Sequence, residues 1–214
     1  MTIHGGPRAP AGRDLAGAVR YAREAADRLP AWLTYHDRAH TFAVVLPAAR
    51  RLSIDEGLDA DTRTLVTLAA CYHDLGFLEA YEGHEAVSAR IAAEVLPGFG
   101  YCDAEVEAVV GMIAATRLPQ RPRTHAERVL ADADLVVIGR RDFLRFDRAL
   151  RQEVERHAGP MCDIEWYGAQ LAFLEGHRYF TRTAKRMRDR RKASNRIQLR
   201  ALLERAERSE TGVS

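Results

Sequence analysis

The stretch Leu65-Val-Thr-Leu-Ala-Ala-Cys-Tyr-His-Asp-Leu-Gly76 joins a helical apolar run to two adjacent reactive side chains, His73 and Asp74. His73 falls at helical spacing from the apolar residues before it, so a helix over 61–75 carries its imidazole on the inward face. Because Gly76 ends that helix, both side chains can turn toward one ligand. A buried aspartate beside a buried histidine needs a partner, and a cation is the obvious one.

Helical periodicity continues along the rest of the chain, and no run of alternating residues indicates a strand. We therefore expect an all-α helical bundle. Pro47 should kink or break the second predicted helix, because proline cannot donate its helical hydrogen bond. Asp61 and Thr124 are expected N-caps, and Glu127 follows Thr124 at capping-box spacing. The predicted helices cover residues 13–29, 36–54, 61–75, 84–96, 103–116, 124–139, 141–157, 163–176 and 180–208.

The composition fits one large helical domain, alone or with a helical extension. The chain has 214 residues, of which 47% are apolar, enough for a sizeable core. No apolar run approaches the ~20 residues needed to cross a bilayer, and the first residues lack the pattern of a secretory signal. We therefore expect a cytoplasmic protein with no membrane partner. Three widely spaced cysteines, Cys71, Cys102 and Cys162, predict neither a disulfide framework nor a zinc ribbon.

The net charge of +2 is unevenly distributed. From Arg178 to Arg208, twelve lysines and arginines oppose three acidic residues, which gives this segment +9 and leaves −7 for the rest. Such a segment could contact nucleic acid or another polyanion, or could simply be a solvated helix face. We expect a flexible N-terminus over 1–12, one helical domain over 13–176, and a basic C-terminal helical extension over 177–214 packed on the same domain.

Other histidines and aspartates could join the first doublet. His40 lies on the inward stripe of its predicted helix. Asp132 and Asp134 point about 200° apart on a helix, so only one should face the core, and the more apolar neighbours of Asp134 favour it. His84 opens the next helix on an inward stripe, where it could be a ligand, a phosphate contact, a general acid or a structural residue.

Two histidines and two aspartates from three separate helices form the expected metal site. Imidazole and carboxylate without thiolate suit one divalent ion, which could be Mn, Fe, Co, Ni, Mg or Zn. The set leaves positions open on an octahedral ion for water and substrate, which favours a catalytic over a structural metal. The expected ligands are His40, His73, Asp74 and Asp134.

The order of these residues resembles the HD-domain superfamily of metal-dependent phosphohydrolases. The family signature H…HD…D reads here His40…His73-Asp74…Asp134, over roughly residues 35–140, with a looser likeness near 178–195. The resemblance implies an HD-domain helical bundle in which these four residues bind metal. Four strings are most similar to a bacterial branch of predicted phosphohydrolases: Tyr35-His-Asp-Arg-Ala-His-Thr41, Tyr72-His-Asp-Leu-Gly-Phe77, Gly83-His-Glu-Ala-Val-Ser-Ala89 and Asp132-Ala-Asp-Leu135.

Two departures from a related branch, which acts on cyclic dinucleotides, favour one metal over two. That branch has a lysine three residues after the HD aspartate, where this chain has Phe77. Its further histidines are also missing, since the corresponding region here reads Ile113-Ala-Ala-Thr-Arg117. His84 matches a second-metal ligand of that branch without its fellow ligands, so we expect it near the substrate. A second, weaker metal remains an alternative.

The resemblance implies hydrolysis of a phosphomonoester or phosphodiester in a small substrate such as a nucleotide. The metal lowers the pKa of bound water, and the resulting hydroxide attacks phosphorus. We expect Asp74 to ligate the metal and orient this water, and His84 to protonate the leaving oxygen. Positive side chains should neutralise the phosphate oxygens. The candidates are Arg117, Arg140 and Arg178.

Other functions fit the same residues. One is a nucleotide-sensing HD-type module without turnover. Another is a nucleic-acid-binding protein that uses the basic segment 178–208, although Tyr179 and Phe180 are its only aromatic residues, which gives base stacking little support. A purely structural metal site is disfavoured because the predicted set leaves open positions.

Overall fold

The computed structural model describes residues 12–210, and this part of the chain is helical without a strand. The predicted flexible N-terminus therefore falls almost wholly outside the described residues. A π-helical turn, His40–Val45, and 3-10 turns at Leu75–Leu78, Leu96–Phe99 and Leu135–Gly139 connect the longer elements. The α-helices are α1 Leu15–Ala26, α2 Leu46–Asp55, α3 Ala60–Tyr72, α4 His84–Val95, α5 Asp103–Ala114, α6 His125–Asp134, α7 Phe143–Ala158, α8 Asp163–Gly176 and α9 Arg182–Glu210.

Helix α3 is the central helix of the bundle. Every residue from Val66 to Tyr72 is buried, so the helix is surrounded on all sides over its last two turns. It packs against α1, α2, α4, α5 and α6. The Tyr72 hydroxyl donates to the backbone oxygen of Ala18 in α1 at 2.9 Å. The residues that follow Tyr72 are therefore delivered into the interior, where His73 is 1% exposed.

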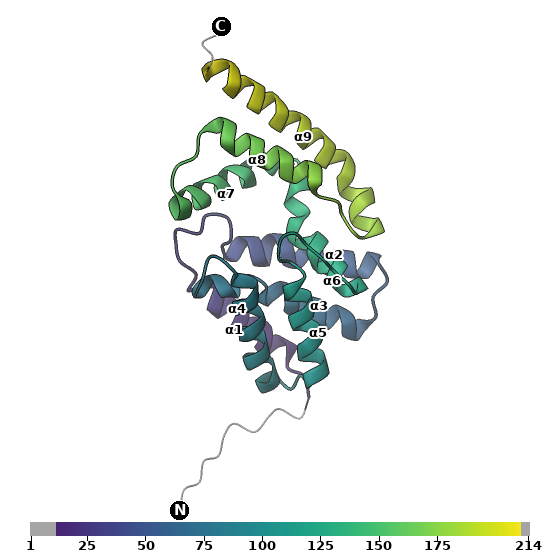
Figure 1. Cartoon of the computed structure of the whole chain (residues 1–214). Coiled ribbons are helices and arrows are strands. Elements are labelled where there is room, and N and C mark those ends of the chain that lie inside the picture. Colours follow the sequence, from purple (N-terminus) through teal and green to yellow (C-terminus); the bar gives the residue numbers. More distant parts are fainter. Residues whose placement is uncertain (1–11, 211–214) are drawn as a thin grey trace, which may run out of the picture.

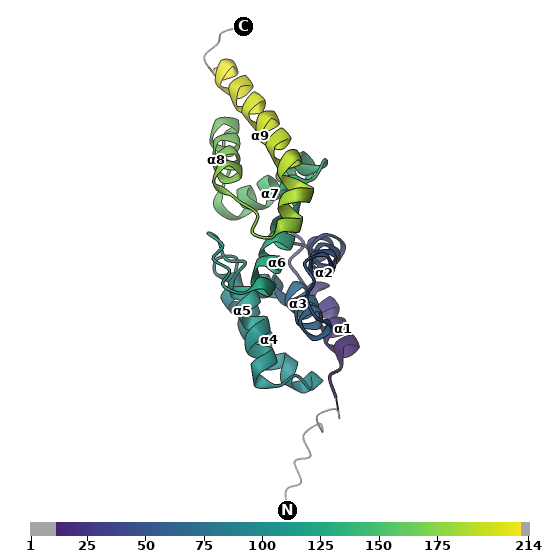
Figure 2. The ribbon, with the colours of Figure 1, turned by 90° about the vertical axis from the view of Figure 1, so that its right-hand side faces the viewer.

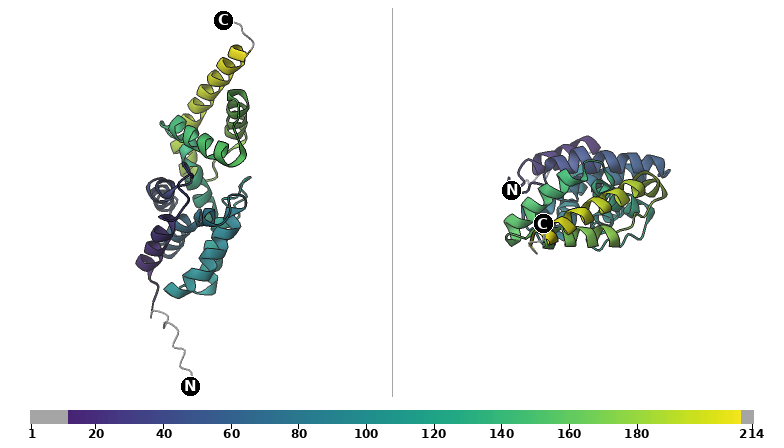
Figure 3. Two further views of the ribbon diagram at one scale, coloured as in Figure 1. Left: turned by 90° about the vertical axis from the view of Figure 1, so that its left-hand side faces the viewer. Right: turned by 90° about the horizontal axis from the view of Figure 1, so that it is seen from above.

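The helices form two parts stacked along the long axis of the molecule. Helices α1 and α3–α5 make one end, α7–α9 make the other, and α2 and α6 lie between them (Figure 1). Helix α9 packs along α8 and against the 3-10 turn Leu135–Gly139. Its last turns project beyond α7 and α8 (Figures 2 and 3). A site beside the end of α6 is thus covered from both parts.

The observed boundaries refine the predicted helices. Pro47 lies in the first turn of α2, where the helix changes from the π-helical turn at 40–45 to α-helix at Leu46 without leaving helical dihedral angles. The capping box at Thr124 is confirmed, with the Glu127 amide donating to its hydroxyl at 3.2 Å. The expected N-cap at Asp61 is wrong, since Asp59 accepts from the Thr62 amide and caps α3.

Several predicted helices end earlier than expected, and two of these ends carry site residues. The helix predicted over 61–75 stops at Tyr72, leaving His73 as its C-cap. The helix predicted over 124–139 stops at Asp134 and tightens into a 3-10 turn. Within the described residues, no helix combines the length and the apolar character needed to cross a membrane.

Candidate metal centre

Four side chains meet where two helices end and a π-helical turn begins. His40 opens the π-helical turn, His73 and Asp74 follow α3, and Asp134 is the last residue of α6. Each of the four residues lies at or next to the end of a helical element, where the backbone changes conformation. The four side chains can therefore converge without distorting a helix. We call these four residues the metal cluster.

The metal cluster is compact. The His73 Nε2 lies 3.2 Å from the Asp74 Oδ2 and 3.5 Å from the Asp134 Oδ1. The His40 Nε2 lies 3.6 Å and 3.4 Å from the same two oxygens. Two atoms bound about 2.1 Å from one ion lie at most about 4.2 Å apart, so all four separations suit a shared ion. The ligand atoms of His40, His73 and Asp74 lie within 4.8 Å of one another.

Four atoms of the metal cluster are buried without a hydrogen-bond partner. They are both ring nitrogens of His40, the Nε2 of His73 and the Oδ2 of Asp74. The opposite ring nitrogen of His73, Nδ1, lies 3.0 Å from the Ala70 carbonyl and donates to it, so the Nε2 lone pair faces the cluster. Unpaired buried polar atoms are costly, and this donor set fits a divalent ion.

The electrostatics of the cluster favour positive charge at its centre. Burial acts to lower the pKa of His73, but the adjacent Asp74 and Asp134 outweigh it and raise that pKa well above its usual value. Burial acts to raise the pKa of Asp74, but the histidines, above all His73, outweigh it and lower that pKa. The nearby imidazoles of His40 and His73 likewise lower the pKa of Asp134 to about 2 against the effect of burial. A divalent ion would supply the same positive charge.

Gly76 fixes His84 beside the metal cluster. A Cβ atom at Gly76 would lie 1.9 Å from the backbone oxygen of His84, so only glycine allows this approach. The Gly76 amide also donates to the Ser88 hydroxyl at 2.7 Å. As a result the His84 Nε2 lies 3.6 Å from the Asp74 Oδ1, while its Nδ1 donates to the Tyr81 carbonyl. His84 is therefore held next to Asp74, as the sequence predicts.

A second imidazole, His36, faces the same space and is held by Glu153 of α7. Glu153 is fully buried and accepts from the Tyr35 and His36 amides at 2.9 and 3.0 Å. Its other oxygen lies 2.5 Å from the His36 Nδ1. Phe77 stacks on both imidazoles, with ring centroids 4.5 Å from His36 and 3.8 Å from His84. We did not predict Glu153, although it continues a helical stripe after Leu150.

Asp132 and Asp134 are both turned inward, which corrects the expectation that only one of them would be. Asp132 is 0% exposed and binds residues that come before α9. It accepts from the Phe180 amide at 2.8 Å, and from the amide and hydroxyl of Thr181 at 2.7 Å each. The helix-face argument missed this because α6 is covered on two opposite sides. We call Asp132, Phe180 and Thr181 the clasp.

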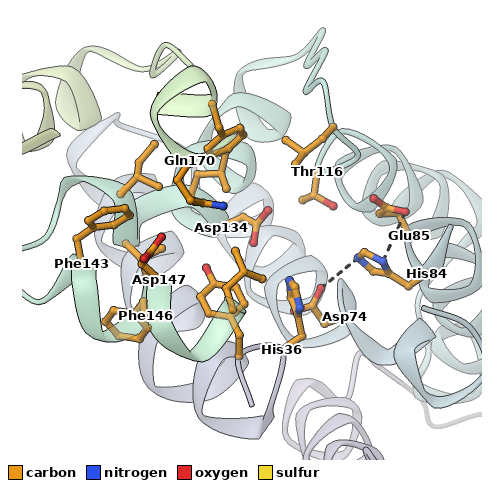
Figure 4. Close-up of a pocket in the computed structure, with 17 residues that line it drawn as sticks. His36, Asp74, His84, Glu85, Thr116, Asp134, Phe143, Phe146, Asp147 and Gln170 are labelled. Carbon is orange, nitrogen blue, oxygen red and sulfur yellow. Dashed lines mark ion pairs between the residues drawn. The ribbon is translucent and has the colours of Figure 1, made fainter. Parts of the chain in front are cut away.

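A cavity of about 290 Å³ opens beside the metal cluster. Asp74, Asp134, His36 and His84 face it from one side, and Asp147 and Gln170 face it from α7 and α8 (Figure 4). Apolar residues make most of the remaining wall: Leu118, Leu135, Val137, Ile138, Phe143, Phe146, Leu150 and Phe173. The arrangement offers a group of possible metal ligands, two further imidazoles and a largely apolar chamber.

The three arginines expected at the phosphate do not line this cavity. Arg117 is exposed. Arg140 forms a two-point ion pair with Asp142 at 2.8 Å and stacks behind the Phe146 ring. Arg178 lines a groove between α8 and α9, and also a pocket that shares Leu118, Leu135 and Phe173 with the cavity. Because none of the three arginines lines the cavity itself, their phosphate contacts stay predictions.

Searches of family models and of curated proteins returned no match. Among solved structures, the chain is similar to a predicted HD superfamily hydrolase from an uncultured Thermotogales bacterium. The TM-score is 0.60 at 21% sequence identity, over 91% of this chain and 94% of that one. The chain therefore shares the fold of an HD-superfamily protein, which confirms the predicted all-α HD-type bundle.

Proposed function

We propose that the protein is a metal-dependent phosphohydrolase of the HD superfamily. The observation that carries the proposal is the metal cluster, with unpaired buried nitrogen and oxygen atoms directed at one point beside a cavity. The H…HD…D order and the shared fold support the same assignment. The substrate we propose is a small phosphomonoester or phosphodiester.

The residues that would hold the ion are His40, His73, Asp74 and Asp134. When bound, the ion would lower the pKa of a coordinated water and polarise the phosphoryl group. The second carboxylate oxygen of Asp74 points to His84, so it can orient a water between them. The proposal thus keeps for Asp74 both of the roles predicted from the sequence.

Two imidazoles are placed to handle protons and phosphate oxygens. His84 holds a proton on Nδ1 against the Tyr81 carbonyl, which leaves its Nε2 toward Asp74 and the cavity. Glu153 holds the His36 ring through Nδ1 and leaves the other ring nitrogen for the cavity. An imidazole oriented by a carboxylate is a common arrangement for proton transfer. The apolar walls exclude water from the leaving group.

The direct test combines metal content with turnover. The purified protein is loaded with Mn²⁺ or Mg²⁺ and assayed with 4-nitrophenyl phosphate and bis(4-nitrophenyl) phosphate. The double variant His73→Ala and Asp74→Ala should lose both bound metal and activity while keeping its helical far-UV CD spectrum. His125→Ala is the matched control, because His125 pairs with Glu56 far from the cavity. Full activity in the double variant would refute the proposal.

A sensing module and a nucleic-acid binder give different results in the same preparation. Metal and nucleotide binding with no product from any phosphoester would indicate a sensor. Nucleic-acid binding should weaken steeply with salt. The basic charge of α9 is partly engaged within the fold, since Arg196 and Arg200 pair with Glu175 and the buried Lys192 donates to the His177 carbonyl. This pairing favours the phosphohydrolase over a nucleic-acid binder.

A further inference from the structure

The end of the cavity formed by α7 and α8 contains a buried carboxylate that the proposed hydrolysis does not use. Asp147 is 4% exposed and lines the cavity beside Phe143 and Phe146. Figure 4 shows this group remote from His84. Gln170 and other residues from α8 close the same end. This corner is part of the cavity but not of the metal cluster.

One oxygen of Asp147 has no partner. Its Oδ2 accepts from the indole nitrogen of Trp166 at 3.1 Å, whereas its Oδ1 is buried without a hydrogen bond. Leaving a buried carboxylate oxygen without a donor is costly, so the site is built to receive an N–H or O–H group. Trp166 itself is 3% exposed, which fixes the carboxylate in place.

The charge and shape of the cavity narrow the class of ligand. Asp74, Glu85, Asp134 and Asp147 line it, and no lysine or arginine is among the described residues that do. A further anionic group at the Asp147 end would thus meet like charge with no cationic side chain on the cavity wall to offset it. Phenylalanine rings beside the carboxylate suit a flat ring, since aromatic groups stack favourably. The Gln170 amide adds one donor and one acceptor.

We propose that Asp147 and the phenylalanines around it form a subsite for an uncharged, flat nitrogen heterocycle that carries N–H donors. The subsite rests on the proposed function in one respect, namely that this ring is the organic part of the phosphoester substrate. It makes Asp147 a specificity-determining residue, with Oδ1 accepting from the ring. Binding to the carboxylate and hydrolysis at the metal cluster are then separable properties.

Nucleosides test the subsite without turnover, because they carry no phosphate to hydrolyse. The full-length protein with one equivalent of Mn²⁺ is titrated calorimetrically with guanosine, adenosine, cytidine and uridine, and with purine riboside, which has no N–H donor on its base. At least one donor-bearing nucleoside should bind about tenfold more tightly than purine riboside, the effect expected for one hydrogen bond to a charged group. Equal affinities throughout would overturn the proposal and leave the Asp147 oxygen to a structural water.

The variant Asp147→Asn tests the residue without changing its shape. Its carbonyl can still accept from Trp166, which turns an N–H group toward the cavity, so the preference for donor-bearing nucleosides should fall below about threefold. Asp147→Leu should also abolish it. Asp163→Asn, an exposed carboxylate on α8, is the matched control and should keep the full preference. A tenfold preference that persists in Asp147→Asn would overturn the assignment to this residue.

Fluorescence locates the binding event. In the variant Trp32→Phe the only tryptophan is Trp166, which touches Asp147 directly. Saturation with the preferred nucleoside should change its emission, and an unchanged signal would place the nucleoside elsewhere. Loss of phosphatase activity in every assay, with the nucleoside preference intact, would refute the hydrolase and keep the subsite. Activity on 4-nitrophenyl phosphate without a nucleoside preference would support the hydrolase and refute the subsite.

Discussion

Asp132 and Asp134 lie two residues apart on α6, yet one is saturated with donors and the other is not. Asp132 receives three hydrogen bonds from Phe180 and Thr181, whereas Asp134 meets only the imidazoles of His40 and His73. Burial raises the pKa of Asp132 despite those hydrogen bonds, while the imidazoles lower the pKa of Asp134. The comparison teaches that burial alone does not mark a site. A buried carboxylate that accepts a full set of hydrogen bonds has a structural role. A buried carboxylate that lacks donors is a candidate metal ligand.

The clasp should dominate stability. Asp132→Ala leaves two backbone amides and one hydroxyl without an acceptor, at roughly 1–3 kcal/mol each, so the free energy of unfolding should fall by about 4 kcal/mol. In a domain of this size the melting temperature should then drop by roughly 8–16 °C, as measured by far-UV CD. The folded fraction should still bind metal. Asp103→Ala, at an exposed position, serves as control, and a melting temperature unchanged from wild type would contradict the clasp.

A substitution in the metal cluster should lower metal affinity strongly and stability only slightly, which is the opposite of the clasp. Asp134→Ala removes a ligand, and since loss of supporting residues alone costs about 10–100-fold in metal affinity, the loss here should exceed about 100-fold. Titration calorimetry with Mn²⁺ measures this affinity. Urea unfolding in EDTA should show a far smaller loss of stability than in Asp132→Ala. Unaltered Mn²⁺ affinity would remove Asp134 from the ligand set.

Removing a single hydroxyl group from the clasp should have a smaller effect on stability. Thr181→Val removes the hydroxyl that donates to Asp132 and accepts from the Ala184 amide, but keeps the Thr181 backbone donor. We expect a loss of about 1.5 kcal/mol in urea unfolding. The double variant with Asp132→Ala should be less unstable than the sum of the two changes, because the residues share one contact. Additive losses would show that the hydroxyl acts independently of Asp132.

The smallest expected effect is a pH dependence at His177, in the segment that leads into the clasp. Burial, reinforced by Lys192, lowers the pKa of His177 to about 4. A histidine with a lowered folded pKa contributes stability that is complete above its unfolded pKa of about 6.5 and is lost as pH falls toward 4. After allowance for its partial exposure, His177→Gln should flatten this acid loss by about 1 kcal/mol relative to wild type. Parallel pH profiles of the two proteins in urea unfolding would contradict this.

The fold and most of the metal cluster were readable from the sequence because both depend on local periodicity. The apolar stripe that ends at His73 and the inward position of His40 each follow from spacing within one helix. An irregularity of the helix near Pro47 could also be predicted, because its missing amide acts on its own helix. These features can be predicted without knowing which helices pack against one another.

The parts that could not be predicted depend on contacts between distant segments. Glu153 binds Tyr35 and His36 across more than a hundred residues, and Asp132 binds Thr181 across 49. A prediction from helix periodicity identifies one apolar face as the buried face. It cannot predict that a second, polar face of the same helix is also buried. The phosphate arginines failed to appear in the cavity for a similar reason, since partners such as Asp142 for Arg140 depend on the fold.

The order of the residues along the chain has a consequence for synthesis. All four proposed metal ligands lie at or before Asp134 in the chain, whereas Asp147 and Gln170 of the cavity wall and Thr181 of the clasp are synthesised later. The nascent chain therefore holds its reactive residues before it can close the chamber around a ligand. Substitutions in α7 and α8 can therefore change the cavity wall without altering the four proposed metal ligands.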